Sequence, residues 1–466
     1  MKPSVMVRMF ALISAMALAP AAVGAQPPPP PKLVVILVVD QMRGDYVDRY
    51  SGQWTKGLHR LIAEGAWFRR AAYPYLNTFT CVGHATVSTG TLPSTHGIVG
   101  NSWYDREAGR STGCIEDPAA AGVSYGLPVK SGGSPARLQV PTLTDELRAQ
   151  LATPTRVVTF SMKDRTAIML AGREGDAVTW FNGAAHGFVT SSAYTAQPVP
   201  FLVEYMKAHP IEADFGQPWT RLLPERQYLF SDSGTGEKPA KYWTSTFPHP
   251  IRIGDGTGAE SYDAWETSPY SDTYLGALGQ AAVDALGLGQ REGTDVLGIS
   301  FSALDLVGHD FGPTSHEVQD VLARLDVTIG TLLDQLDRKV GARNYVVALT
   351  ADHGAAPIPE QVSGQGVDAG RLKTNALTKA ATDALQAMLG PGTYTIRLAN
   401  SEMYLDPAVT SYLRESPSAL EAVLRAIRAV PGVANAYLAD ELDQHAAAGD
   451  TDARAALESY FPGRSG

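Results

Sequence analysis

The segment LVVILVVD, from Leu33 to Asp40, consists of seven consecutive apolar residues followed by a carboxylate. Three further runs share this design. They are Arg156–Ser161 before Lys163, Val296–Ser302 before Asp305, and Tyr345–Thr350 before Asp352. Apolar runs without alternation are typical of parallel strands that are covered on both faces. We therefore predict that these four runs are buried strands of one parallel sheet.

Helical patterns lie between the predicted strands. Residues 55–64 form one, and residues 315–340 form a clearer one whose apolar positions recur on one face. The second begins with a capping-box pattern at Thr314–Glu317, and Gly341 can end it. This alternation of strands and helices predicts an α/β fold, with a mostly parallel central sheet and helices on both faces.

Two segments depart from this alternation. Residues 172–273 are rich in Gly, Pro, Trp and Tyr, and we predict an insertion that covers the site. Residues 357–442 combine helical and strand-like patterns, and we predict a small α+β subdomain. The core is then expected at 33–356, with a C-terminal remnant of a truncated chain at 443–466.

The first 25 residues have the pattern of a secretory signal peptide, with a basic start, a short apolar run and small residues before the expected cut. A stiff proline-rich leader follows at residues 26–32. We expect a periplasmic or secreted mature protein that is not held in a membrane after cleavage. In an oxidising compartment Cys81 and Cys114 could pair, or they could remain two buried thiols, and the sequence leaves both possibilities open.

The composition excludes some partners. The chain has 466 residues, 44% of them hydrophobic and 18% charged, which predicts a globular protein with a sizeable core. The formal net charge is −10, and acids and bases are mixed along the chain without a basic stripe. We therefore expect no nucleic acid as a specific partner. The oligomeric state is left open.

The four predicted strand ends carry groups suited to a metallohydrolase. The groups are Asp40, Lys163 with Arg165, Asp305 with His309, and Asp352 with His353. Each has an ordinary explanation as a cap or a solvated pair, but sites of α/β sheets lie at this edge, and the joint occurrence favours a site there. Carboxylate and imidazole ligands are common in zinc sites, and two metal ions can clamp the oxygens of an in-line displacement. If the strand continued past Lys163, Lys163 and Arg165 would share a face and suit a phosphoryl group.

The segment NTFTCVGHATVSTG, Asn77 to Gly90, brings several hydroxyl groups to the expected start of a helix. A helix N-terminus favours an anion, and a hydroxyl bound to a divalent metal becomes a nucleophile. The candidates are Thr78, Thr80, Thr86, Ser88 and Thr89. The first turn favours Thr78 or Thr80, and the residues alone do not choose between these two.

Six motifs occur in the order VVDQMRGDY, NTFTCVGHATVSTG, HGIVGNSWYD, SMKDR, SALDLVGHDFGP and TADHG. Together they resemble the alkaline phosphatase superfamily, and within it the zinc alkaline phosphatases that use a threonine nucleophile on a fold like that of type I phosphodiesterases and nucleotide pyrophosphatases. The resemblance runs from about Lys32 to about Leu442. It implies hydrolysis of small phosphate monoesters, and we expect broad tolerance of the leaving group.

The resemblance selects Thr80 as the nucleophile that forms a phosphoenzyme, and it implies two zinc ions. The implied ligands are Asp40, Thr80, Asp352 and His353 for the first ion, and Asp305 and His309 for the second. In the family a His from a final segment completes the second set. No such segment follows the predicted subdomain here, so the second site is expected to lack one ligand. His445, in a polar Ala-rich stretch, is not expected to replace it.

The resemblance also places Asn101, Lys163 and Arg165 on the phosphoryl oxygens. This trio distinguishes monoesterases from the related diesterases and pyrophosphatases, because a monoester carries an additional negative charge. Three alternatives remain open. They are a phosphodiesterase or nucleotide pyrophosphatase on the same fold, a sulfatase, which needs a modified Cys or Ser, and a non-catalytic relic that binds phosphate or metal.

Overall fold

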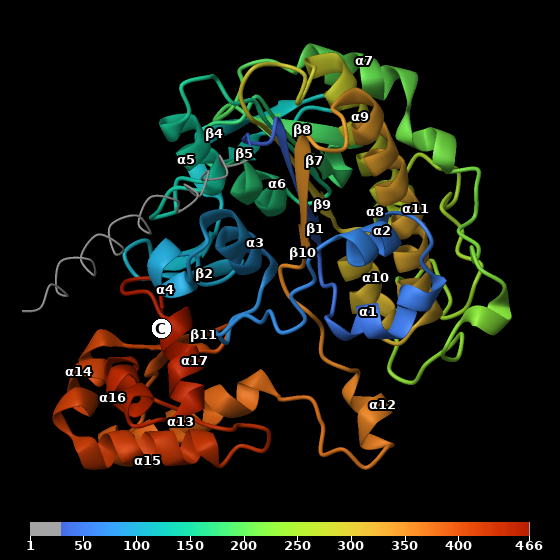
Figure 1. Ribbon diagram of the computed structural model, residues 1–466. Coiled ribbons are helices and arrows are strands. Elements are labelled where there is room, and N and C mark those ends of the chain that lie inside the picture. The colour runs from blue at the N-terminus through green and yellow to red at the C-terminus, as the bar shows by residue number, and fades with distance from the viewer. Residues whose placement is uncertain (1–28, 466) are drawn as a thin grey trace, which may run out of the picture. The chain divides into compact units, whose positions relative to one another are not determined.

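The four predicted strands lie in one sheet in a computed structural model that describes residues 29–465 (Figure 1). The predicted signal peptide falls outside the described residues. The main compact unit of the chain starts at Pro31. The strands are β1 (Leu33–Val39), β6 (Val157–Ser161), β9 (Asp295–Phe301) and β10 (Tyr345–Thr350). They are parallel and lie in the order β10-β1-β9-β6. The predicted parallel sheet is confirmed. The prediction that all four strands are buried was wrong for β10, because β10 is the edge strand of the sheet and Val346 on it is 49% exposed.

Four more strands extend the sheet on the β6 side. They are β7 (Ala177–Asn182), β8 (Gly187–Ser191), β4 (Glu116–Ser124) and β5 (Ser131–Gly133). β7 is parallel to β6, and the pairs from β7 outward are antiparallel, so the sheet is mostly parallel. β7 and β8 lie within residues 172–273, so the predicted insertion was wrong in its first part. The reason is that these two strands belong to the central sheet and are buried in it, although the segment around them is rich in Gly and Trp.

Helices cover both faces of the sheet, as predicted. Successive side chains of β1 alternate between two hydrophobic clusters, with Val35 and Leu37 in one and Ile36 and Val38 in the other. The first cluster is completed largely by α9 (Pro269–Leu286) and α11 (His316–Lys339), and the second by α6 (Asp164–Ala171) with a contribution from α3 (Thr80–Thr89). Ser315 caps α11, and its side chain accepts a hydrogen bond from the backbone N–H of Val318.

Shorter elements complete the core. Those before β9 are α1 (Asp45–Tyr50), η1 (Ser51–Gln53), α2 (Gly57–Glu64), α4 (Pro93–His96), a separate hairpin of β2 (Ser102–Asp105) and β3 (Arg110–Gly113), α5 (Leu143–Gln150), η2 (Gly183–Ala185), α7 (Pro200–Ala208), η3 (Ile211–Asp214), η4 (Glu225–Gln227) and α8 (Ala259–Glu266). After β9 comes α10 (Ala303–Phe311). No helix among the described residues has both the length and the apolar character needed to traverse a bilayer.

The chain after β10 forms its own small hydrophobic cluster. Its elements are α12 (Pro359–Ser363), α13 (Thr374–Leu389), β11 (Thr395–Ala399), β12 (Glu402–Leu405), α14 (Pro407–Glu415), α15 (Pro417–Arg428), η5 (Ala439–Glu441), α16 (Leu442–Ala447) and α17 (Thr451–Ser459). Helices α13, α14 and α15 supply most of the cluster. The last segment contacts the core, because Ser459 Oγ accepts a hydrogen bond from the backbone of Leu76, and Arg464 donates to the carbonyl groups of Gly97 and Arg137.

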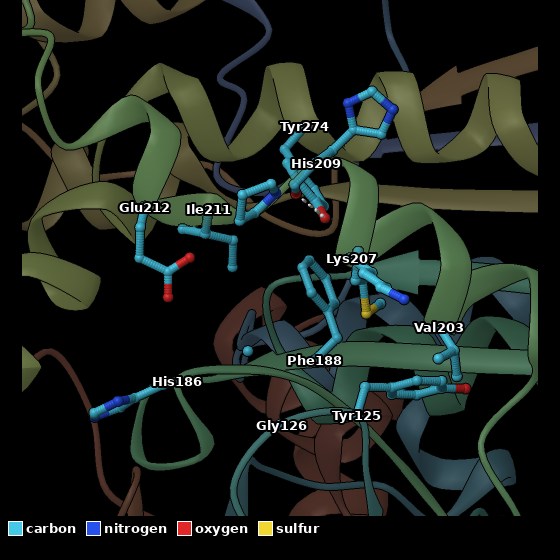
Figure 2. Close-up of a pocket in the computed structure, with 13 residues that line it drawn as sticks. Tyr125, Gly126, His186, Phe188, Val203, Lys207, His209, Ile211, Glu212 and Tyr274 are labelled. Carbon is cyan, nitrogen blue, oxygen red and sulfur yellow. Dashed lines mark hydrogen bonds between the residues drawn. The ribbon is translucent and has the colours of Figure 1, made fainter.

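A pocket of about 260 Å³ lies beside β8, α7 and η3 (Figure 2). Its walls include the aromatic rings of Tyr125, Phe188 and Tyr274, with Lys207 and Glu212 at the polar side. None of the predicted site residues lines it. The pocket is thus separate from the carboxyl edge of the parallel strands, where the predicted site residues lie.

Candidate metal centre and active site

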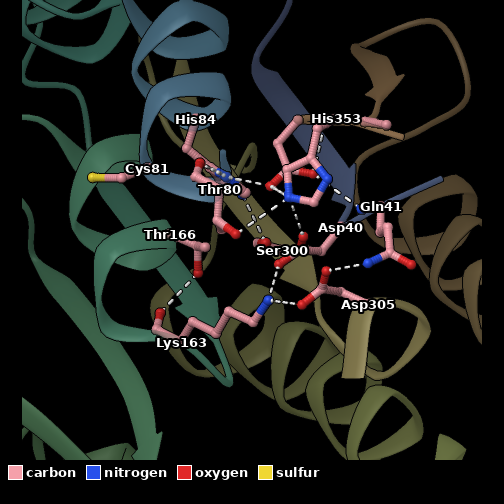
Figure 3. A network of polar contacts seen from close by, with 12 residues as sticks. Asp40, Gln41, Thr80, Cys81, His84, Lys163, Thr166, Ser300, Asp305 and His353 are labelled. Carbon is pink, nitrogen blue, oxygen red and sulfur yellow. Dashed lines mark hydrogen bonds and ion pairs between the residues drawn. The ribbon is translucent and has the colours of Figure 1, made fainter. Parts of the chain in front are cut away.

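The carboxyl ends of three parallel strands bring predicted ligands together (Figure 3). Asp40 directly follows β1, Asp305 lies in the first turn of α10 after β9, and His353 follows β10. Each of these three residues offers a ligand atom, and the three atoms lie within 4.8 Å of one another. Side chains from three separate strand ends thus lie together, as the strand-end pattern predicted.

Thr80 and Asp352 complete the first set of predicted metal ligands. His353 Nε2 lies 3.3 Å from Thr80 Oγ1, 3.4 Å from Asp40 Oδ1 and 3.5 Å from Asp352 Oδ2. Thr80 is the first residue of α3, so its hydroxyl lies at the helix N-terminus, whereas Thr78 is exposed and precedes the helix. Carboxylate, imidazole and hydroxyl groups converge here in a donor set suited to one divalent cation.

The charges at this point fit a bound cation. Asp40 is fully buried, and its Oδ1 accepts no hydrogen bond from any described residue. Burial, reinforced by the charge of Asp352, raises the pKa of Asp40 well above its ordinary value. A buried carboxylate oxygen that accepts no hydrogen bond is costly unless a positive charge meets it. Lys163 pairs with Oδ2 of Asp40, so the donor set and the Oδ1 oxygen fit a metal ion held at Asp40.

Lys163 is the cation that the chain itself supplies. Its Nζ lies 2.5 Å from Asp40 Oδ2 and also contacts Asp305 Oδ2. Burial alone would lower the pKa of Lys163, but the charges of these two carboxylates outweigh it and raise the pKa. The Lys163 ammonium thus contacts two of the three buried carboxylates, whereas Oδ2 of the third, Asp352, lies 3.2 Å from His84 Nδ1.

The second predicted set is smaller and more open. His309 Nε2 lies 3.3 Å from Asp305 Oδ1, and the His309 side chain is 70% exposed. Its hydrogen bond with Asp305 raises the pKa of His309. Among the described residues, no cluster of three potential ligands includes His309. His445 does not join this set, because it lies on α16 with its ring 5.2 Å from that of Tyr437.

The predicted phosphoryl-binding residues come from two elements. Asn101 precedes β2, and its Oδ1 accepts a hydrogen bond of 2.8 Å from the backbone N–H of Cys81 in the first turn of α3. Because the amide oxygen is engaged, the Nδ2 donor is the group of Asn101 that can face a ligand. Among the described residues, no acceptor takes a hydrogen bond from this Nδ2, so it can donate to a ligand.

Lys163 and Arg165 do not share a strand face, because the strand does not continue past Lys163. Strand β6 ends at Ser161, and α6 starts at Asp164, with Lys163 as the residue before the helix. The two side chains therefore leave a helix start in different directions. Lys163 is buried against the carboxylates, whereas Arg165 is partly exposed with its guanidinium 3.8 Å from Asp164.

Gln41 and His84 hold the ligands in place and were not predicted. Gln41 adopts the left-handed conformation with φ 65°, and its backbone N–H donates to Asp352 Oδ1 while its side chain donates to Asp305 Oδ1. His84 Nδ1 lies 2.9 Å from the Thr80 carbonyl oxygen and 3.2 Å from Asp352 Oδ2. For His84, its position one helical turn after Thr80 was a local signal that the two residues could be in contact. For Gln41 there was no such signal, because its partners are far away in the sequence.

Residues 34–454 match the family described as type I phosphodiesterase / nucleotide pyrophosphatase. The chain belongs to this family. Among its relatives is the alkaline phosphatase PhoV of Synechococcus elongatus, 35% identical over 69% of this chain and 58% of that protein. Another is the alkaline phosphatase PafA of Elizabethkingia meningoseptica, 34% identical over 82% of this chain and 73% of that protein. The match thus spans little more than half the length of PhoV and about three quarters of PafA.

This chain has the same fold as wild-type PafA in its crystal structure. The two superpose with a TM-score of 0.85 at 31% identity, and the aligned part covers 94% of this chain and 84% of the PafA chain. A second PafA structure, with a TM-score of 0.86, is of a variant substituted at a threonine, an asparagine, a lysine and an arginine. This chain therefore belongs to the alkaline phosphatase superfamily. The resemblance that its six motifs indicated is confirmed.

Proposed function

We propose that this protein hydrolyses phosphate monoesters at a two-zinc centre through a phosphothreonine intermediate. The observation that carries the proposal is the convergence of Thr80 Oγ1, Asp40, Asp352 and His353 at the carboxyl edge of the sheet. Bound divalent ions supply Lewis-acid stabilisation of the attacking and leaving oxygens. The alkaline phosphatase relatives support the same class of reaction.

The reaction has two displacements at phosphorus. Thr80 Oγ1 loses its proton and attacks phosphorus in line, which forms the Thr80–phosphate bond and breaks the bond to the alcohol or phenol, and the leaving oxygen takes up a proton. Water then attacks phosphorus of the phosphothreonine, which breaks the Thr80–phosphate bond and releases hydrogen phosphate, and one proton of the water passes to Thr80 Oγ1. The start of α3 favours this chemistry, because the N-terminus of a helix stabilises an anion.

Asn101, Lys163 and Arg165 bind the non-bridging oxygens in this proposal. The PafA variant is substituted at a threonine, an asparagine, a lysine and an arginine. In this chain the same four residue types, Thr80, Asn101, Lys163 and Arg165, occur in the same order and at the same intervals along the sequence. Lys163 shares Asp40 and Asp305 with any bound cation, so its ammonium becomes available to the phosphoryl group when those carboxylates are otherwise neutralised.

Replacing Lys163 and Arg165 together with alanine should discriminate between monoesters and diesters. We expect kcat/KM for phenyl phosphate to fall by about 10²-fold or more, because two charge-assisted contacts to the dianion are lost. The loss for a bis-aryl phosphate should be much smaller, since a diester carries one charge less. Steady-state kinetics on both substrates measures the difference. An equal loss on both substrates, or a large preference of the wild type for the diester, would favour the phosphodiesterase alternative.

The remaining parts of the proposal concern the metal and the location. Carboxylates and imidazoles without a cage of carbonyl oxygens favour zinc over calcium or magnesium. The second ion is assigned to Asp305 and His309, with fewer protein ligands than the first. Small phosphate esters are the proposed substrates, in the periplasm or outside the cell. A protein that bound metal without turnover would instead be the non-catalytic relic considered above.

A further inference from the structure

Cys81 and Cys114 form a disulfide beside the candidate nucleophile. Cys81 directly follows Thr80 in α3, and Cys114 directly follows β3, so the bond joins two elements that are 33 positions apart in the sequence. Both cysteines are almost fully buried in one hydrophobic cluster with Trp103. The Cys81 sulfur points away from the polar network around Asp40 and Asp305 (Figure 3). The disulfide therefore does not take part directly in the chemistry proposed for that network.

Both cysteines are hydrogen-bonded to Asn101. The backbone N–H of Cys81 donates to Asn101 Oδ1 at 2.8 Å, and the backbone N–H of Cys114 donates to the Asn101 carbonyl oxygen at 3.0 Å. The disulfide thus connects the two residues that hold Asn101. The N–H of Cys81 orients the Asn101 side chain, and the N–H of Cys114 holds the Asn101 main chain. The free Nδ2 of Asn101 gains its direction from these two contacts.

The disulfide adds a covalent link to the packing of Trp103 from β2 in the same hydrophobic cluster as α3. Asn101 is exposed, and it precedes a hairpin of β2 and β3 that forms a two-stranded sheet separate from the central sheet. Two-stranded hairpins are marginally stable by themselves, whereas α3 is packed on the core. A covalent link at the hairpin end therefore limits the movement of Asn101 relative to Thr80.

We propose that the Cys81–Cys114 disulfide is a positioning element for phosphoryl binding by Asn101. This inference rests on the function proposed above, in which Asn101 binds a non-bridging oxygen. The ordinary alternative is that the bond only stabilises the fold by restricting the unfolded chain. The two roles differ in one respect: a positioning role requires Asn101, and a purely stabilising role does not.

A double-mutant cycle on kcat/KM for phenyl phosphate separates the two roles. It compares the wild type, Cys81→Ala/Cys114→Ala, Asn101→Ala and the triple variant, at a temperature where circular dichroism shows each to be folded. Loss of the disulfide should lower kcat/KM by about tenfold while Asn101 is present, since small displacements of positioning groups are costly. It should have almost no further effect once Asn101 is alanine. The inhibition constant of inorganic phosphate should rise by a similar factor in the first comparison and stay constant in the second.

A matched control lowers the stability of the fold by a substitution away from Asn101 and the disulfide. Leu336→Ala creates a cavity under α11 and should lower Tm while kcat/KM remains close to that of the wild type. If Cys81→Ala/Cys114→Ala does not fold, Cys81→Ala/Cys114→Val restores buried apolar volume and enters the same cycle. An equal loss with and without Asn101, or no loss in either background, overturns the positioning role alone. If Asn101→Ala itself leaves kcat/KM unchanged, the proposed phosphoryl-binding role of Asn101 fails, and the inference fails with it.

Discussion

Thr80→Ala should lower kcat/KM for a phosphate monoester by about 10⁴-fold or more, because the substitution removes the oxygen that we propose attacks phosphorus. The hydroxyl lies 3.3 Å from His353 Nε2 at the start of α3, where no other hydroxyl of the segment Asn77–Gly90 is both at the helix N-terminus and beside the carboxylates. Steady-state assays with phenyl phosphate measure the loss. Circular dichroism should show an unchanged fold, since a buried threonine is replaced by a smaller residue.

Thr78→Ala is the matched control for this prediction. Thr78 is the other hydroxyl favoured by sequence, but it is exposed and precedes the helix, so its loss should leave kcat/KM nearly unchanged. Acid quenching during turnover, followed by mass spectrometry of the peptides, should show a phosphoryl group on Thr80 in the wild type. Full turnover in Thr80→Ala, or a phosphoryl group on Thr78, would refute the assignment of the nucleophile.

Removal of the metal by a chelator should lower turnover by about 10³-fold or more, because the stabilisation of the attacking and leaving oxygens is lost. It should also lower Tm, since the buried carboxylates of Asp40 and Asp305 would then share the single ammonium of Lys163. Adding zinc should restore both quantities. Turnover and differential scanning calorimetry before and after dialysis measure the two effects, and full activity in the chelated protein would contradict the metal-dependent mechanism.

Replacing His309 or His445 tests which histidine holds the second zinc ion. His309→Ala should reduce the zinc content from two ions per chain toward one, because it removes the imidazole beside Asp305. His445→Ala should leave two ions, because His445 lies on α16 away from the cluster. Elemental analysis of the purified variants decides the point. A loss of zinc on replacing His445 would show that the ligand assignment is wrong.

The sequence predicted the central sheet well where the pattern was local. Unbroken apolar runs identified β1 and β10 with their observed bounds, and β6 and β9 within one residue at each end. Strands β7 and β8 escaped prediction. They are short, and the surrounding Gly- and Trp-rich segment masks them, although the sheet buries both. Burial against distant strands is a tertiary effect that a short window of sequence does not report.

The site was predictable to the extent that the fold imposes it. The carboxyl ends of parallel strands meet at one edge, so Asp40, Asp305 and His353 could be expected to converge. The direction of Lys163 could not be expected, because it depends on where β6 ends and α6 begins. The contacts of Gln41 could not be expected either, since they join positions far apart through a left-handed backbone conformation without a local signature.

Anomalous diffraction at the zinc absorption edge, on crystals of the protein purified with zinc, tests the central claim most directly. The account predicts two peaks roughly 4 Å apart. One should lie within coordinating distance of Thr80, Asp40, Asp352 and His353, and the other beside Asp305 and His309. A map without a peak within reach of Asp40 and His353, from crystals of protein that hydrolyses phenyl phosphate, would contradict the account.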